Sequence, residues 1–272
     1  MKKRILAALL VFVALLTGCS RKETTGQWPS QKIEIDVCYT AGGTADTVAR
    51  QLSALMSQQL STTFNLVNVT GGSGSIAGQQ VYAAAHDGYT WLGDVAHTVS
   101  GWRTLGYADL GWEDFYGFYA ASSPYVLFVS GNSPYQTAQQ LFDAMRGDPS
   151  MKWGNAGLGS INQLTGSLML EKLGLKGNSV PYDGGRSAAI KVVAGEVTWS
   201  WCGLSDILDL AQSGDIRILG ICDSSPREID CAKGNYTVPS LLDDYPELSD
   251  LQGLLYWGFR VSRDTPADAV AK

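Results

Sequence analysis

Four glycine-rich loops are the segments of this sequence best suited to bind a ligand. They read Ala41-Gly42-Gly43-Thr44-Ala45-Asp46, Gly71-Gly72-Ser73-Gly74-Ser75, Asn155–Ser160 and Asp183-Gly184-Gly185-Arg186-Ser187. Glycine lets the backbone approach a ligand closely, and free N–H groups at the start of a helix attract an anion. Each loop taken singly is also consistent with a plain turn or helix cap. Together they predict a site for a small anion, with two loops on each side of a cleft.

Residues for catalysis are scarce. The two histidines are His86 and His97, and there is no G-x-S-x-G, H-E-x-x-H or Ser/His/Asp set. Asp46 is most simply a first-turn or capping residue, since a lone carboxylate is insufficient for acid–base catalysis. Gly72–Ala77 fits a dinucleotide pattern with Asp94 about 20 residues further on, but it does not follow the first strand, and exported proteins rarely meet NAD. We therefore expect a protein that is not an enzyme and has no cofactor.

Cys19 ends a bacterial lipoprotein export signal. Lys2–Arg4 form a positive segment, Ile5–Leu16 an apolar one, and Leu16-Thr17-Gly18-Cys19 places small residues before a thiol that can be alkylated with diacylglycerol. The apolar segment is too short to cross a bilayer comfortably. An ordinary signal peptide with an incidental cysteine is the alternative. We predict a signal peptide over 1–18, a flexible tether over 19–27, and an extracytoplasmic protein held at a membrane by lipid on Cys19.

The remaining cysteines and the net charge limit the other partners. Cys222 and Cys231 flank a polar loop and could form a disulfide, while the pairing of Cys38 with Cys202 is left open. No C-x-x-C spacing and no neighbouring histidine supports a metal site, so none is expected. A net charge of −6 without a Lys/Arg cluster argues against nucleic acid as a partner.

The loops need a scaffold of alternating strands and helices. Apolar runs predict strands over 33–38, 64–69, 90–93, 153–155, 179–181, 197–201 and 216–222. Amphipathic stretches predict helices over 44–60, 75–85, 162–172, 187–194 and 205–212. This alternation is typical of an α/β fold in which mainly parallel sheets are flanked by helices, and ligands bind such sheets outside the carboxyl ends of the strands.

Two extended segments, over 118–129 and 254–261, separate the two series of strands and helices. They predict two lobes joined by two crossing strands. The first lobe is expected over 28–124 and 254–272, and the second over 125–253.

The sequence resembles the receptors of tripartite tricarboxylate transporters, also called Bug proteins. The matching segments follow one another in order along the chain after the signal: Trp28–Ile33, Tyr39–Asp46, Gly71–Gly74, Asp87–Thr90, Asn155–Ser160, Val180–Tyr182, Ala194–Val197, Val238–Leu241, Trp257-Gly258 and Thr265–Ala267. The resemblance implies a two-lobed, type II periplasmic-binding-protein-like fold that binds a small carboxylate, acts as a monomer and serves a two-subunit membrane permease. Against the family pattern, we expect that the last few dozen residues, which would pack on the first lobe, are missing from this sequence.

The resemblance also implies how the carboxylate is held, largely by backbone N–H groups and bridging water between the loop at 39–46 and the loop at 156–160. In this interpretation Asp46 braces the first loop. Tyr182 and Trp201 wall the cleft, with core packing as the alternative for both. The predicted binding residues are Tyr39, Ala41, Gly42, Gly43, Thr44, Asp46, Gly72, Ser73, Gly74, Ala156, Gly157, Gly159, Ser160, Tyr182 and Trp201.

Several positions near the predicted site depart from the family pattern: Cys38 for proline, Val69 for arginine, Gln163 for histidine, Asp183 for lysine, and Asp94 and His97 in a stretch that is often small and hydroxylated. Among them, the changes at Val69, Gln163 and Asp183 remove positive groups, and the two aspartates add negative charge. Like charges repel strongly in a partly desolvated cleft, which favours a mono- or dicarboxylate, including one with an amine or aromatic ring, over a tricarboxylate. The competing functions are a sensory lipoprotein that presents a ligand to a membrane kinase, and an extracytoplasmic enzyme.

Overall fold

The computed structural model describes residues 28–272. The predicted signal peptide, the tether and the lipidation site Cys19 lie outside the described residues. Among the residues described, no helix is both long and apolar enough to span a bilayer.

The first lobe is built on a parallel sheet of three strands. Strand β1 (Ile33–Val37) lies between β2 (Phe64–Asn68) and β3 (Thr90–Val95), and pairs parallel with both. Helix α2 (Thr44–Leu60) follows β1, and α3 (Ser75–Ala83) follows β2. The buried face of α2 includes Ala45, Ala49 and Ser53, four residues apart, as expected for a helix packed along one side on a sheet.

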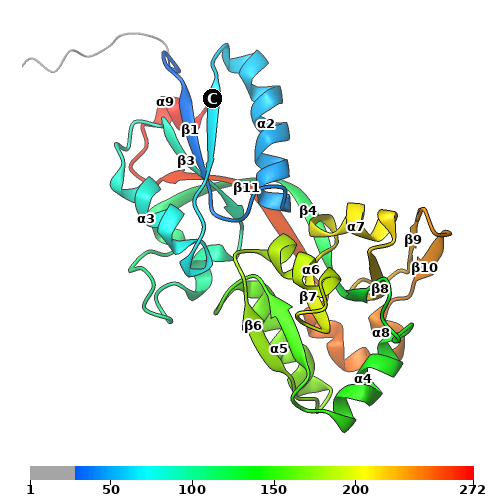
Figure 1. Cartoon of the computed structure of the whole chain (residues 1–272). Helices are drawn as coiled ribbons and strands as arrows, with labels where there is room; N and C mark the ends of the chain where they lie inside the picture. Colours follow the sequence, from blue (N-terminus) through cyan, green and yellow to red (C-terminus); the bar gives the residue numbers. More distant parts are fainter. Residues whose placement is uncertain (1–27) are drawn as a thin grey trace, which may run out of the picture.

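Two long antiparallel strands hold the lobes together. The first part of β4 (Phe115–Ser130) pairs with β11 (Leu254–Ser262), and its second part pairs with β7 (Trp199–Gly203) and β8 (Ile216–Ile221). Strand β11 also pairs with β3. The result is one nine-stranded sheet in the order β2-β1-β3-β11-β4-β7-β5-β6, with β8 on β4. Figure 1 shows β4 and β11 running between the two lobes, as the sequence predicted.

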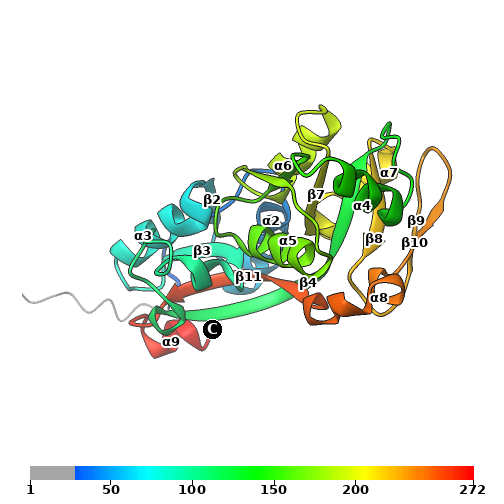
Figure 2. The same ribbon diagram turned by 90° about the horizontal axis from the view of Figure 1, so that it is seen from below.

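The second lobe repeats the strand–helix alternation. Strand β5 (Lys152–Asn155) pairs parallel with β6 (Asn178–Pro181) and β7. Helices α5 (Ile161–Lys172), α6 (Gly185–Val193) and α7 (Leu208–Ser213) follow β5, β6 and β7. Figure 2 shows α5 and α6 beside this part of the sheet. The fold is therefore the expected α/β arrangement, in which the outer strands are parallel and the crossing strands antiparallel.

Further elements complete the described chain: α4 (Ala138–Gly147), β9 (Arg227–Ile229), β10 (Tyr236–Val238), α8 (Leu241–Asp244), α9 (Ala267–Val270), and 3-10 helices over Gly72–Gly74, Thr98–Gly101, Trp112–Asp114, Leu204–Asp206 and Pro246–Leu251. Strands β9 and β10 pair antiparallel as a separate ribbon.

A buried ion pair fastens β3 to β11. Arg260 Nε donates to Asp94 Oδ2 at 2.6 Å, and the two side chains are 1% and 0% exposed. Arg260 also donates to the Ala96 carbonyl, and its guanidinium lies 4.4 Å from the centroid of the Trp112 ring. Asp94 is therefore not the free acid near the binding site that the sequence suggested, because its charge is balanced within the first lobe.

The possible disulfide between Cys222 and Cys231 is absent from the described structure. Cys38, Cys202, Cys222 and Cys231 all carry free thiols. Cys222 is buried directly after β8, whereas Cys231 lies on the ribbon between β9 and β10, where its N–H donates to Asn235. Burial, with the nearby Asp223 charge, raises the pKa of Cys222 to about 12, so this thiol is a poor partner for oxidation.

Candidate functional site

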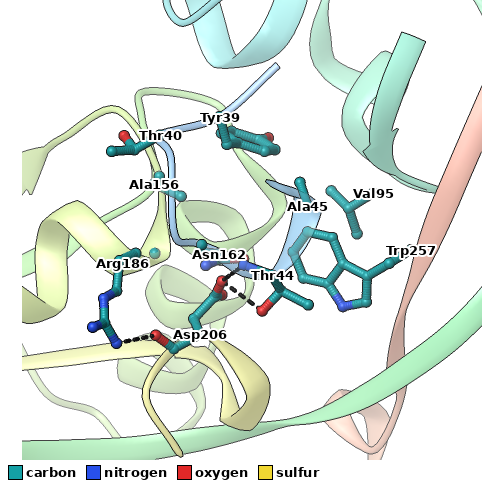
Figure 3. Close-up of a pocket in the computed structure, with 13 residues that line it drawn as sticks. Tyr39, Thr40, Thr44, Ala45, Val95, Ala156, Asn162, Arg186, Asp206 and Trp257 are labelled. Atoms are coloured by element: carbon teal, nitrogen blue, oxygen red, sulfur yellow. Dashed lines mark hydrogen bonds between the residues drawn. The ribbon is translucent and has the colours of Figure 1, made fainter. Parts of the chain in front are cut away.

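The site lies where loops at the carboxyl ends of the strands of both lobes meet. The first lobe contributes the β1–α2 loop at residues 38–43 and the 3-10 turn before α3. The second lobe contributes the turns after β5, β6 and β7. This is the location that the strand-end rule predicts for a ligand. Figure 3 shows side chains from both lobes facing one another here.

Hydrogen bonds join the loops of the two lobes. Thr40 donates to the Asp183 carbonyl through its N–H at 3.2 Å and through its hydroxyl at 2.6 Å. The same hydroxyl lies 2.8 Å from the hydroxyl of Ser187. Ser73 Oγ donates to the Leu158 carbonyl at 2.7 Å. These contacts hold the cleft in a closed arrangement.

The most buried contact between the lobes is made by Asp206. Its Oδ1 accepts from the N–H of Thr44 at 2.9 Å and from the Thr44 hydroxyl at 2.8 Å (Figure 3). The oxygen of that hydroxyl also lies 2.9 Å from the Ser205 hydroxyl. Asp206 is 4% exposed. Burial raises the pKa of Asp206, although the donors of Thr44 and the charge of Arg186 act in the opposite direction. A carboxylate from the second lobe thus sits at the N-terminus of α2.

The cleft is divided into a closed part and an open part. The closed part holds only about 10 Å³ and is lined by Gly43, Thr44, Asn162, Asp206 and other residues of both lobes. The open part is a groove of about 500 Å³, which is within the size range of small-molecule sites. It lies between Gly71–Gly74 of the first lobe and segments 156–158 and 181–183 of the second. Tyr39 and Ala156 line both parts.

Asp46 holds the first glycine loop in shape. It is buried, and it accepts from the N–H of Gly42 at 3.0 Å, from Asn68 Nδ2 at 3.1 Å and from two nitrogens of Arg50. Asn68 also donates to the Tyr39 carbonyl at 2.9 Å. Burial raises the pKa of Asp46, but the hydrogen bonds from Arg50, Gly42 and Asn68 outweigh burial and leave it below its usual value.

Replacement of Asp46 by asparagine should therefore lower the free energy of unfolding by about 1–3 kcal/mol, the usual range for losing a charge-assisted hydrogen-bond network. The pKa of Asp46 is lower in the folded protein than in the unfolded chain. The stabilisation by its charge is therefore fully present above the unfolded pKa, and it is lost as the pH falls through the folded pKa. Urea unfolding measures this effect: the free energy of unfolding should differ less between D46N and wild type at acidic pH than at pH 7. An equal difference at both pH values would mean that the charge of Asp46 has no role.

The structure brings most of the predicted residues to the cleft. Tyr39, Gly43, Thr44 and Ala156 line its closed part, and Tyr39, Gly72, Ser73, Gly74, Ala156, Gly157 and Tyr182 line the groove. Ala41, Gly42, Gly159 and Ser160 belong to the loops but line neither cavity. Ser160 caps α5 by accepting from the N–H of Gln163 at 3.2 Å, and the Gly159 N–H donates to Gln163 Oε1 at 3.2 Å.

Trp201 does not wall the cleft. The strand predicted over 197–201 runs instead to Gly203, which places Trp201 within β7 and not at its end. The side chain is fully buried, stacks on Tyr125 at a centroid distance of 5.4 Å, and donates from Nε1 to Thr165 Oγ1 at 3.0 Å. Trp201 is therefore a core residue of the second lobe.

Some cleft residues lie outside the predicted residue list. Gly184, Gly185, Arg186 and Ser187 belong to the fourth predicted glycine-rich loop, whereas Asp206, Asn162, Thr40 and Lys191 were not singled out. The segment Leu204-Ser205-Asp206 directly follows a strand, so the strand-end rule applied to β7 would have included it.

Comparison with known proteins identifies the family. The profile described as "Tripartite tricarboxylate transporter family receptor" matches residues 48–229. The chain belongs to this family. It is similar to a UPF0065 protein of Bordetella bronchiseptica, with 27% identity over 252 residues that cover 90% of this chain and 72% of that one. A UPF0065 protein of Pseudomonas sp. (strain P51), encoded between tcbD and tcbE, is 29% identical over 201 residues. The chain spans 59% of the length of that relative, and the match covers 72% of the chain.

Solved structures of other proteins share the fold. A periplasmic transporter has a TM-score of 0.80 with 24% identity, and the alignment covers 90% of this chain and 81% of the transporter chain. An R. palustris protein solved with adipate has a TM-score of 0.78 with 25% identity over the same shares of the two chains. MatC from Rhodopseudomonas palustris, solved with malate, has a TM-score of 0.78 with 23% identity, and covers 90% of this chain and 82% of its own.

Proposed function

We propose that this protein is an extracytoplasmic solute-binding receptor. It captures a small carboxylate in the cleft between its lobes and delivers the ligand to a two-subunit membrane permease. The observation that carries the proposal is the meeting of strand-end loops from two lobes around a groove of about 500 Å³. The family membership and the adipate complex of a protein with 25% identity support a carboxylate as the ligand class.

The proposed mechanism is capture by closure of the lobes around the crossing strands β4 and β11. Closure brings Thr40, Thr44 and Ser73 of the first lobe against carbonyl and side-chain oxygens of the second. A lipid on Cys19 would keep the receptor near the permease and raise its effective concentration at the membrane. We propose no catalytic step: His86 lies 3.2 Å from Asp264, and neither histidine lines the groove or the closed part of the cleft.

Isothermal titration calorimetry of the purified receptor with six-carbon acids tests this function. We expect adipate, hexanoate or 6-aminohexanoate to bind with a Kd of about 1 μM to 1 mM and to raise the melting temperature, because a ligand that binds only the folded state stabilises it by mass action. Glucose and 1,6-diaminohexane, which carry no carboxylate, are the controls. Binding of either control in preference to every acid would contradict the proposal.

A further inference from the structure

Asp206 occupies the position at the N-terminus of α2 where a ligand carboxylate was expected. Its Oδ1 accepts a hydrogen bond from the N–H of Thr44, the first residue of this helix. Its Oδ2 lies against the start of α6, since a Cβ added to Gly185 would be 2.6 Å from it. The carboxylate thus lies between the N-termini of two helices from opposite lobes, where both helix dipoles favour negative charge.

The other expected amides of the first loop are also occupied. The Gly42 N–H donates to Asp46, and the Gly43 N–H donates to the Thr40 carbonyl at 3.2 Å. In the second lobe, the Gly157 N–H donates to Asn155 Oδ1 at 3.0 Å. These expected anion-binding amides are therefore occupied by the protein's own oxygens.

The cations beside the cleft are also paired with carboxylates of the protein. Two nitrogens of Arg186 donate to the carboxylate of Asp209. Arg186 also donates to the Asp206 carbonyl at 3.3 Å (Figure 3). Lys191 lies 2.8 Å from Glu196, which also accepts from the Tyr182 hydroxyl. Among the described side chains that line these cavities, neither Asp206 nor Asp183 forms an ion pair, because Arg186 pairs with Asp209 and Lys191 with Glu196.

We infer that Asp206 is a specificity-determining residue that takes the place of one ligand carboxylate, so that the groove accepts an acid with a single carboxylate and discriminates against di- and tricarboxylates. This inference rests on the proposed function. A second carboxylate directed toward the closed part would meet Asp206, and one directed toward the rim would meet Asp183. Like charges repel strongly at such sites because the partly desolvated cleft screens them poorly.

A matched series of ligands isolates the effect of the second charge. Adipate, hexanoate and 6-aminohexanoate share a six-carbon chain and one carboxylate, and end in a carboxylate, a methyl group and an ammonium group. By calorimetry we expect the wild-type receptor to bind hexanoate and 6-aminohexanoate at least about 10-fold more tightly than adipate. If adipate and 6-aminohexanoate were both rejected to the same degree, the groove would be excluding polarity and not negative charge, and the inference would be wrong.

The substitution Asp206→Asn removes the charge and keeps an oxygen that accepts from Thr44. We expect it to narrow the preference for hexanoate over adipate by about 10-fold or more. Asp206→Ser is the second variant, to be used if circular dichroism shows that the first does not fold. Asp243→Asn removes the same charge from an exposed position on α8, remote from the cleft lining, and should leave the preference unchanged.

The outcomes separate this inference from the proposed function. Tight binding of adipate by the wild type, with the same ratio in D206N, would overturn the inference and leave a carboxylate receptor. A ratio that shifts equally in D243N would also overturn it, because the effect would then come from net charge. Failure of all three acids to bind would overturn the proposed function and the inference that depends on it.

Discussion

Replacing Arg260 by methionine is expected to lower the free energy of unfolding by about 3–5 kcal/mol, the range measured when one partner of a buried ion pair is removed. The substitution leaves the Asp94 carboxylate 0% exposed without its cation. Its other oxygen, Oδ1, already has no hydrogen-bond partner among the residues described. Urea unfolding at pH 7.5, followed by tryptophan fluorescence, measures the loss.

The decrease in the free energy of unfolding caused by R260M should be smaller at acidic pH. Burial raises the pKa of Asp94 to about 6 even with Arg260 beside it, and removal of that cation raises the pKa further. A carboxyl whose folded pKa exceeds its unfolded value destabilises the fold at a pH above that pKa, and this effect disappears as the group takes up a proton. The difference between R260M and wild type should therefore be larger at pH 7.5 than at pH 5.

An exposed pair gives the matched control. Arg146 and Asp143 lie on α4 with side chains 51% and 58% exposed, so Arg146→Met should change the free energy of unfolding by less than about 1 kcal/mol at either pH. If R260M lowered the free energy of unfolding as little as R146M, the ion pair of Asp94 and Arg260 would not stabilise the packing of β3 on β11. The double variant D94N/R260M should recover part of the loss, since it leaves no buried charge.

Local sequence patterns predicted most of the scaffold. Helix 44–60 coincides with α2, and the strands at 64–69, 153–155 and 216–222 each differ from the observed strands by one residue at one end. Apolar alternation between turn residues is a local signal, and here the tertiary structure agrees with it. Helix α4 was not predicted, although its buried residues Leu141, Phe142 and Met145 have helical spacing.

The position of the site was predictable, but the pairing of its groups was not. The strand-end rule places the loops on one edge, and this holds for Gly43 and for Gly72–Gly74. It does not say which oxygen satisfies each amide. Thr44 and Asp206 are 162 residues apart, and Asp94 and Arg260 are 166 apart, so only the folded chain shows which groups of the protein bind each carboxylate.

The substitution Gly43→Val should weaken binding of the tightest six-carbon acid by about 100-fold while the protein remains folded. Gly43 has φ −76° and ψ 173°, a conformation open to any residue, so valine does not strain the backbone. Even the first side-chain carbon would lie 3.2 Å from the Thr40 carbonyl and 3.5 Å from Cβ of Arg186 in the other lobe. The two methyl groups of valine would then press the lobes apart.

The expected loss of affinity in G43V follows from the hydrogen bonds that break when the lobes separate. Thr44 makes three hydrogen bonds to Asp206 and Ser205, and each contributes about 1 kcal/mol net. A loss of about 3 kcal/mol from the closed state lowers the apparent affinity about 100-fold, because a ligand that binds the closed form must first restore it. Small-angle scattering of the ligand-free protein should show a larger radius of gyration for G43V.

The neighbouring glycine supplies the control. Gly42 has φ +76°, so alanine there costs about 1 kcal/mol in backbone strain, but its side chain meets nothing within 4 Å. Gly42→Ala should thus lower the melting temperature slightly and leave both the affinity and the radius of gyration close to wild type. If G43V closed normally and bound the acid as tightly as G42A, the contact between Thr44 and Asp206 would not control closure. The ligand would then be held in the groove by the first lobe or the second lobe alone, and not by their approach.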